Sequence, residues 1–261
     1  MTSLLEAFGL NLPEMVAIIG SGGKTSLMFA LAAEAVGLGG RVVTTTTTKI
    51  WVPRPDQSPQ IILHRDRHEL RRRTRRALAE SGQATVALYR NKDDKLVGPA
   101  PETVDAIMAD WGVDLLLVEA DGARGMALKA PDPKEPVIPS RVDIVIPVVG
   151  LGGLGRPLDG ATVFRPDRFE RLSEIRPGDP VTAEGVGRVL FHPEGLCRDA
   201  GRARIIPFLN QADLVGPGKS QNAAHAILRI GNHQIDRIVW GSLQDPDLGV
   251  HMMTRETAAL E

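Results

Sequence analysis

A glycine-rich stretch near the start of the chain has the residue types of a phosphate-binding loop. Residues 19–26 read IGSGGKTS, between an apolar run that predicts a buried strand and a segment with helical spacing. The amides of such a turn and a helix N-terminus bind anions, Lys24 can reach the outer phosphates of a nucleotide, and Thr25 can offer a hydroxyl to Mg²⁺. We predict a nucleotide site that includes Gly20, Ser21, Gly22, Gly23, Lys24, Thr25 and Ser26.

The loop departs from the full Walker pattern, which places a glycine six residues before the lysine. Ile18 stands at that position, so the loop is shortened to G-S-G-G-K-T. It is similar to the G-T-N-G-K-T loop of the ATP-dependent ligases that build peptidoglycan precursors. A plain glycine-rich turn with a surface lysine is the alternative. The strand before the loop and the helix after it favour the phosphate site.

Two acidic residues follow a later apolar run. In DLLLVEADGARG the run ends in Glu119, and Asp121 follows two residues on. A carboxylate at the end of a strand next to a phosphate loop can hold Mg²⁺, directly or through water. We predict Glu119 and Asp121 as catalytic residues and metal ligands, with their separate roles open. The alternative is that they cap or salt-bridge a loop.

A row of threonines ends another predicted strand, RVVTTTTTKI. Thr44, Thr46 and Thr48 share one face of an extended chain, and Thr46 is our predicted metal ligand from this row. Lys49 is a candidate contact for the γ-phosphate. Threonine also favours strands on its own account, so a half-exposed strand without chemical function is the alternative.

Two later pieces resemble base-recognition elements of GTPases. Asn210, Gln211 and Asp213 lie in LNQAD, close to Asn-Lys-x-Asp, and a carboxylate can accept two hydrogen bonds from guanine but not from adenine. We predict that Asn210 and Asp213 contact the base. Gln211 replaces the usual lysine, so the choice between GTP and ATP stays open. Capping of the next helix by Asn210 and Asp213 is the alternative.

The second piece is GSL after the following predicted strand. GTPases keep Ser-Ala-Lys or a relative of it at that place, and we include Gly241 and Ser242 among the predicted nucleotide contacts.

Basic residues follow the acidic strand end. Arg124 and Lys129 lie where a mobile loop could bring a cation onto the phosphates, and Arg124 is our predicted catalytic cation. Glu135 lies among four prolines that stiffen its loop. Solvated basic side chains and an exposed acid are the alternatives.

Composition and charge exclude several classes of function. The formal net charge is −1, so no overall field attracts nucleic acid or an anionic membrane. Seven arginines between residues 65 and 76 predict a solvated or partner-docking helix. The single Cys197 allows no internal disulfide, the six histidines have no zinc-site spacing, and no apolar run approaches the ~20 residues of a membrane span. We expect a cytoplasmic protein without a signal peptide.

The elements that position these residues alternate along the chain. Apolar runs predict strands at 15–19, 41–43, 114–118, 143–149, 203–209 and 235–240. Helical spacing occurs at 24–36, 65–80, 101–110, 181–190 and 218–230. The alternation predicts an α/β fold of the P-loop NTPase type, with a mostly parallel sheet between helices, in a single domain over 1–261. We also expect a hairpin over 84–98 and, over 122–200, a loop-rich insertion above the active edge.

Several motifs together resemble the YqeC family. They are GSGGKTS, TTTTTKI, VEADGARGMALKAP, EPVIP, VVGLGGLGRPL, FRPDRF, HPEGL and LNQADLV. This family is associated with maturation of selenium-dependent molybdenum hydroxylases. The resemblance implies a P-loop nucleotide-binding protein that assists such an enzyme or its cofactor.

Three functions remain open. The first is hydrolysis of GTP or ATP with Mg²⁺, in which Lys24, the metal ion and a loop cation stabilise the developing charge. The second is kinase-like or ligase-like transfer to a cofactor precursor. The third is a non-hydrolysing scaffold that binds nucleotide and a partner, either a molybdenum hydroxylase or a cofactor-processing protein.

Overall fold

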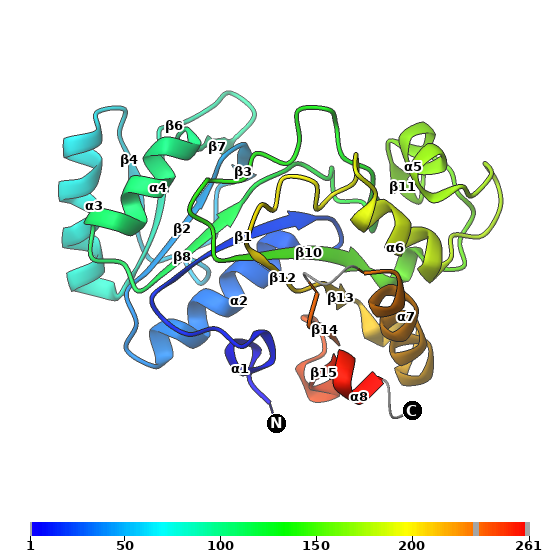
Figure 1. Ribbon diagram of the computed structural model, residues 1–261. Helices are drawn as coiled ribbons and strands as arrows, with labels where there is room; N and C mark the ends of the chain where they lie inside the picture. The colour runs from blue at the N-terminus through cyan, green and yellow to red at the C-terminus, as the bar shows by residue number, and fades with distance from the viewer. Residues whose placement is uncertain (1, 232–234, 259–261) are drawn as a thin grey trace.

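The computed structural model describes residues 2–231 and 235–258, and its central feature is a ten-stranded sheet between helices (Figure 1). The remaining residues of the predicted 1–261 range lie outside the described part. The sheet has the order β15-β14-β13-β10-β1-β8-β2-β5-β4, with β12 paired to β10. Its described pairs are parallel except for β14 and β15. The predicted fold class, a mostly parallel sheet between helices, is confirmed.

The strands of this sheet have the following bounds: β1 Glu14–Gly20, β2 Val42–Thr46, β4 Ile61–Leu63, β5 Gln83–Ala87, β8 Leu115–Glu119, β10 Ile144–Gly150, β12 Arg204–Ile205, β13 Phe208–Asn210, β14 Arg237–Gly241 and β15 Val250–Thr254. The α-helices are α1 Leu4–Phe8, α2 Lys24–Gly37, α3 Arg67–Ser81, α4 Pro101–Asp110, α5 Pro166–Ser173, α6 Ala183–Phe191, α7 Pro217–Ile230 and α8 Arg255–Ala258. Five of the six predicted strands and all five predicted helices form, whereas the predicted strand 203–209 is divided into the two short strands β12 and β13. Within the described residues, no helix combines the length and the apolar character that crossing a membrane requires.

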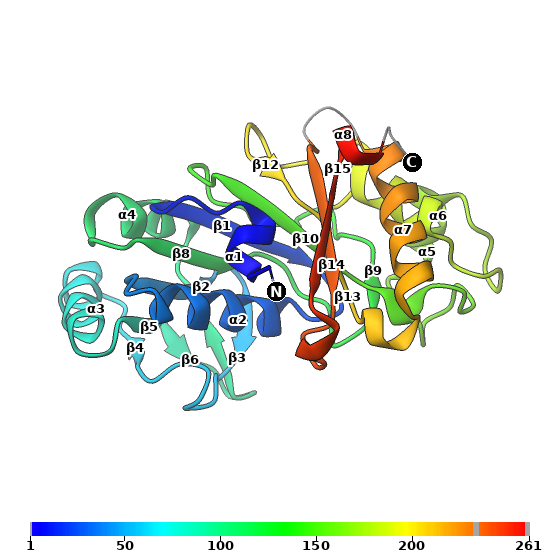
Figure 2. The same cartoon turned by 90° about the horizontal axis from the view of Figure 1, so that it is seen from below.

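The sheet is buried on both faces because its central strands are apolar on both faces. Val16 and Ile18 of β1 pack with α1 and α2, whereas Ala17 and Ile19 pack in a cluster that includes α5, α6 and α7. Met15 contacts a third cluster, with α3 and α4. Alternate residues of a strand point to opposite faces, so each strand contributes to two core layers. Figures 1 and 2 show the helices on either side of the sheet.

The predicted hairpin over 84–98 is only partly correct. Its first half is β5, which joins the central sheet in parallel with β2 and β4 because all five of its residues are buried. The hairpin itself is shorter and consists of β6 Tyr89–Arg90 and β7 Lys95–Val97, on either side of the polar turn. Together with β3 Lys49–Trp51 these strands form a small antiparallel sheet.

The range 122–200 contains more regular structure than a loop-rich insertion. It includes β10 in the middle of the sheet, the helices α5 and α6, and a two-stranded sheet of β9 Leu128–Lys129 and β11 Val163–Phe164. The apolar run of β10 is buried along its whole length, which explains why it pairs with β1 rather than lying above the edge.

The central strand β8 provides a test of this packing. Leu117 is fully buried between β1 and β2, so Leu117→Ala should lower the free energy of unfolding by about 2–5 kcal/mol, the usual cost of removing a large core side chain. Leu38→Ala is the control, because Leu38 is 78% exposed and its loss should change stability by less than about 0.5 kcal/mol. Chemical denaturation measures both, and equal effects would contradict the core assignment.

Candidate nucleotide site

The glycine-rich turn connects β1 to α2 through a backbone that other residues cannot adopt. Gly20, Gly22 and Gly23 have φ values of 89°, 86° and 129°, in the region that favours glycine. A Cβ atom at Gly20 would overlap the carbonyl oxygen of Val148, and one at Gly22 would overlap the backbone of Gly150. The turn therefore lies directly against β10, which fixes its position relative to the sheet.

The turn presents a row of amides with no partner inside the protein. Ser21 donates its amide to the carbonyl of Val148 (2.9 Å), but in the described structure the amides from Gly22 to Ser26 have no hydrogen-bond acceptor. The first turn of a helix leaves its amides unsatisfied, and here the glycine turn extends that row. Such a row is suited to bind an oxyanion, as predicted for a phosphate loop.

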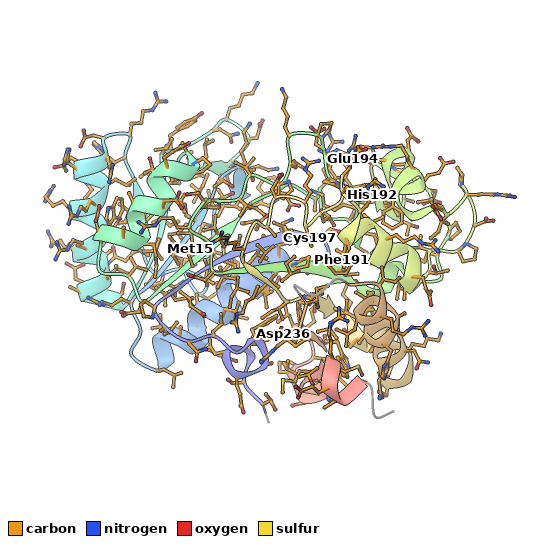
Figure 3. The ribbon with its side chains drawn as sticks, in the orientation of Figure 1. Met15, Phe191, His192, Glu194, Cys197 and Asp236 are labelled. Carbon is orange, nitrogen blue, oxygen red and sulfur yellow. The ribbon has the colours of Figure 1, made fainter. Side chains whose placement is uncertain are left out.

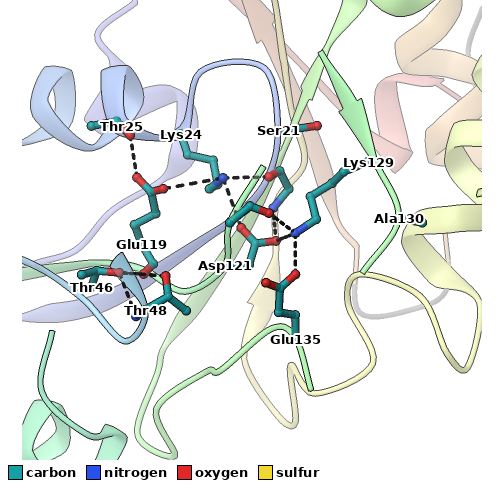
Figure 4. A network of polar contacts seen from close by, with 12 residues as sticks. Ser21, Lys24, Thr25, Thr46, Thr48, Glu119, Asp121, Lys129, Ala130 and Glu135 are labelled. Carbon is teal, nitrogen blue, oxygen red and sulfur yellow. Dashed lines mark hydrogen bonds and ion pairs between the residues drawn. The ribbon is translucent and has the colours of Figure 1, made fainter. Parts of the chain in front are cut away.

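Lys24 begins α2 and is buried, at 5% exposure. Its ammonium donates to the carbonyl of Gly20 (2.9 Å) and lies 3.2 Å from Asp121 and 3.6 Å from Glu119 (Figure 4). Burial alone would lower the pKa of Lys24, but the two carboxylates outweigh burial and raise it. The Lys24 side chain is therefore positively charged and lies beside the row of amides that have no acceptor.

Glu119 ends β8 and lies beside Thr25. The Thr25 hydroxyl donates to Glu119 Oε2 at 2.6 Å, and both residues line one large cavity. Burial raises the pKa of Glu119, while Lys24 and Thr25 oppose that shift. A hydroxyl and a carboxylate in contact are the oxygen ligands that Mg²⁺ prefers, so these two residues fit a metal ion held jointly with phosphate oxygens. In the described residues no group of three His, Cys, Asp or Glu could hold a metal by itself.

Asp121 has a different environment from Glu119, although both were predicted as metal ligands. It is fully buried, and its Oδ2 accepts from the amide of Gly20 (2.9 Å) and from the Lys129 ammonium (2.8 Å). Asp121 is not among the residues that line the cavity. Its contacts attach the phosphate loop to the segment after β8, so the structure gives it a positioning role.

Thr46 also lies apart from the cavity. Its hydroxyl donates to the carbonyl of Glu119 at 2.6 Å and contacts the Thr48 hydroxyl at 3.1 Å, and the residue is fully buried. Thr47 and Thr48 line the cavity instead. The predicted metal ligand Thr46 therefore joins the ends of β2 and β8, because β2 is still buried in the sheet at this residue.

Lys129 is not the mobile loop cation that the sequence suggested. Its side chain is fully buried, and its ammonium contacts Asp121 (2.8 Å), the Gly122 carbonyl (2.6 Å) and Glu135 (3.0 Å). Burial would raise the pKa of Glu135, but Arg165 and Lys129 hold it down at about 2. Of the two predicted loop cations, only Arg124 is exposed and lines the cavity.

Asn210 at the end of β13 connects two loops. Its Nδ2 donates to the carbonyl of Gly22 (2.7 Å), and its Oδ1 accepts from the amide of Leu243 (3.1 Å). Both ends of its side-chain amide are thus occupied by backbone groups. The contacts support the phosphate loop and the segment after β14, and they differ from the predicted contact with a base.

Asp213 and Ser242 line the same cavity as the phosphate loop. Asp213 is exposed on a short 3₁₀ turn at Ala212–Leu214, and Ser242 follows Gly241 at the end of β14. Gln211 accepts from the amide of Gly152 at 3.3 Å, which holds the start of this turn. The predicted base contacts Asp213 and Ser242 therefore meet the phosphate loop in space, whereas Gly241 is not a lining residue.

The cavity has a volume of about 1250 Å³ and also contains residues that sequence reasoning assigned no chemistry. Trp51, Lys95, Phe164 and Arg165 line it together with Arg124. The only sequence signal was a large aromatic after TTTTTKI and the motif FRPDRF. Because these segments are far apart in the chain, their meeting depended on the tertiary fold.

Cys197 and His192, which are labelled in Figure 3, are not among the residues that line this cavity. Cys197 is buried in the core cluster that includes α6, and burial raises the pKa of its thiol. His192 follows α6 and accepts from the amide of Glu194 at 3.0 Å through Nδ1. These positions assign neither residue a chemical role.

The buried pair of Lys129 and Asp121 can be tested by removing one charge. Lys129→Met should lower the free energy of unfolding by about 3–5 kcal/mol, because Asp121 and Glu135 lose their shared buried cation. Lys134→Met, at an exposed lysine in the same segment, is the matched control and should have little effect. Chemical denaturation of both variants measures the free energy of unfolding. A small decrease for Lys129→Met would contradict the structural role of Lys129.

Several known proteins are similar to this chain. The family described as "YqeC protein" matches residues 16–167, more than half of the sequence. A protein of Escherichia coli strain K12 described as "Uncharacterized protein YqeC" is 29% identical over 234 residues, which cover 89% of each chain.

Two solved structures show weaker likenesses. The signal recognition particle 54 kDa protein from Aeropyrum pernix in complex with GDP has a TM-score of 0.42 at 15% identity, over 93% of this chain and 44% of its own. The MinC:MinD cell division protein complex from Aquifex aeolicus has a TM-score of 0.40 at 15% identity, over 86% and 80%. At these TM-scores, neither structural likeness supports an inference about the function of this chain. The family match and the shared length show that the chain belongs to the YqeC family.

Proposed function

We propose that the protein binds a nucleoside triphosphate with Mg²⁺ at the turn between β1 and α2 and hydrolyses it. The observation that carries this proposal is the row of acceptor-free amides from Gly22 to Ser26 beside the buried ammonium of Lys24. A triphosphate supplies the acceptors that these groups lack. The contact between Thr25 and Glu119 adds oxygen ligands at the same place.

The residues around the turn have separate roles toward the triphosphate. Lys24 moves its ammonium from the two carboxylates to the outer phosphates, and the amides of the turn hold the other phosphate oxygens. Thr25 and Glu119 would hold Mg²⁺, which would supply positive charge to the outer phosphates. Arg124, exposed at the cavity wall, stabilises negative charge that develops on the transferred phosphoryl group.

The proposed biological role rests on the resemblance to the family alone. The resemblance to the YqeC family supports a part in maturation of a selenium-dependent molybdenum hydroxylase or of its cofactor. No residue contact in the chain identifies that partner. Nucleotide turnover would then time a delivery or maturation step.

Transfer of a phosphoryl group to an acceptor is a second candidate function. The size of the cavity favours it, because about 1250 Å³ exceeds the roughly 300–1,000 Å³ typical of sites for one small ligand. Steady-state hydrolysis by the purified protein without any acceptor supports the first function. Turnover only with an added cofactor precursor supports transfer, and binding without turnover supports a nucleotide-dependent scaffold.

Removal of the loop lysine tests the site itself. Lys24→Ala should lower affinity for GTP and ATP with Mg²⁺ at least about a hundredfold, since a charge-assisted contact to phosphate is lost. Isothermal titration calorimetry measures the affinities, and circular dichroism checks that the variant is folded. Lys219→Ala, at an exposed lysine on α7, is the control. Retained affinity in folded Lys24→Ala would show that the nucleotide binds elsewhere.

Asp213 tests the choice of base. If its carboxylate accepts from guanine, the wild type binds GTP more tightly than ATP, and Asp213→Ala loses roughly tenfold to hundredfold in GTP affinity with little change for ATP. Asp247→Ala is the control, because Asp247 is exposed and does not line the cavity. Tighter binding of ATP by the wild type would overturn guanine recognition by Asp213.

A further inference from the structure

We propose that the cavity contains a second binding site, beyond the nucleotide, for a small anion that carries a flat ring. This distal subsite is lined by Lys49, Trp51, Lys95, Arg124 and Phe164. The proposal deepens the proposed function and rests on it for the identity of the first ligand and for the position of its base near Asp213.

The topology places the distal subsite on the other side of the phosphate loop from the residues proposed to contact the base. Asp213 and Ser242 follow β13 and β14, on one side of β1 in the sheet. Lys49 and Trp51 follow β2, on the other side of β1. Arg124 and Phe164 come from the segments after β8 and β10, the two strands that flank β1. A nucleotide with its phosphates at the turn and its base near Asp213 therefore leaves the distal half of the cavity unfilled.

One wall of the distal subsite is a face of the small antiparallel sheet. Ile50 is 3% exposed and packs into the core, so Lys49 and Trp51 on either side of it project together from the opposite face. Trp51 pairs with Lys95 across the strands, and the Lys95 ammonium lies 4.5 Å from the centre of its ring. Trp51 is nevertheless 62% exposed, which leaves ring surface for a ligand.

The facing wall carries two arginines around one aromatic ring. The guanidinium groups of Arg124 and Arg165 lie 5.0 Å and 4.4 Å from the centre of the Phe164 ring. Both arginines have positive φ values, 49° and 64°, a conformation that is unfavourable for a non-glycine residue. Backbone strain of this kind persists where a structure holds a side chain in a required place, and here both side chains line the cavity.

The charges around the distal subsite do not cancel. Arg165 is paired with Glu135 at 2.8 Å. In contrast, no carboxylate of the described residues lies within 4 Å of the charged groups of Lys49, Lys95 or Arg124. Two unpaired lysines on the face that carries Trp51 favour an anionic ligand. The exposed Trp51 ring adds a stacking surface, so the ligand chemistry is a phosphate or carboxylate attached to a flat ring system.

Flavin mononucleotide is a suitable probe because it joins a flat ring to a phosphate and is fluorescent. It is titrated into the protein both without nucleotide and with a saturating non-hydrolysable triphosphate analogue and Mg²⁺, and quenching of flavin fluorescence reports binding. We expect binding in both states. Riboflavin, which lacks the phosphate, and inorganic phosphate, which lacks the ring, should bind at least about tenfold more weakly.

Two substitutions localise the probe. Trp51→Ala and Lys95→Gln should each weaken flavin mononucleotide binding about tenfold or more and leave affinity for the triphosphate analogue unchanged, whereas Trp51→Phe should retain much of the binding. Tyr89→Ala and Lys92→Gln are the matched controls in the neighbouring hairpin, because neither residue lines the cavity. Circular dichroism checks that each variant is folded.

The outcomes separate this proposal from the proposed function. Displacement of the probe by the triphosphate analogue, equal binding of riboflavin or phosphate, or unchanged binding in Trp51→Ala and Lys95→Gln would each overturn the distal subsite, as would absence of probe binding. If the triphosphate analogue itself does not bind, the proposed function fails. The titration of flavin mononucleotide into the nucleotide-free protein and its variants still tests the distal subsite.

Discussion

The structure of the site depends on a buried balance of charge between two lysines and two carboxylates. Lys24 and Lys129 approach Asp121 from its two oxygens, and Lys24 also lies near Glu119. Buried charges are costly unless they are paired, so these four side chains hold one another in place. Because Lys129 is a second cation on Asp121, Lys24 can turn toward a phosphate without leaving that carboxylate unpaired. The arrangement thus allows Lys24 to contact a ligand while Lys129 keeps its ion pair with Asp121.

Parallel strands bring this network together. The carboxyl ends of β1, β8, β10 and β13 lie side by side in the sheet, so the glycine turn, the acidic segment and Asn210 reach the same edge. Asn210 then holds the turn to the segment after β14 through both ends of its side chain. The shortened loop is held by these neighbours and by its close approach to β10.

The same edge supports a cavity with two chemically different halves. Near β13 and β14 it offers an exposed carboxylate and a serine, whereas on the side of β2 it offers Lys49, Lys95 and the Trp51 ring. The small sheet of β3, β6 and β7 forms part of the second half and is anchored in the core by Ile50 and Leu96. A site of this form suits a protein that holds a nucleotide and a second compound close together.

The sequence by itself determined the strands and the glycine-rich turn, because both are local, whereas the order of the strands in the sheet depends on pairing between distant segments. The apolar runs specify buried strands, and strand, glycines, Lys24 and Thr25 lie within a dozen residues. The roles of the two acidic residues depended on contacts made in the folded chain. Glu119 lies beside Thr25, whereas Asp121 accepts hydrogen bonds from Gly20 and Lys129. Thr46 and Asn210 differed from their predicted roles for the same reason, whereas the ammonium of Lys129 contacts Asp121, Gly122 and Glu135 within its own segment. Which polar group is buried and which faces the cavity is decided by packing between segments far apart in the chain, and no spacing within one segment encodes it.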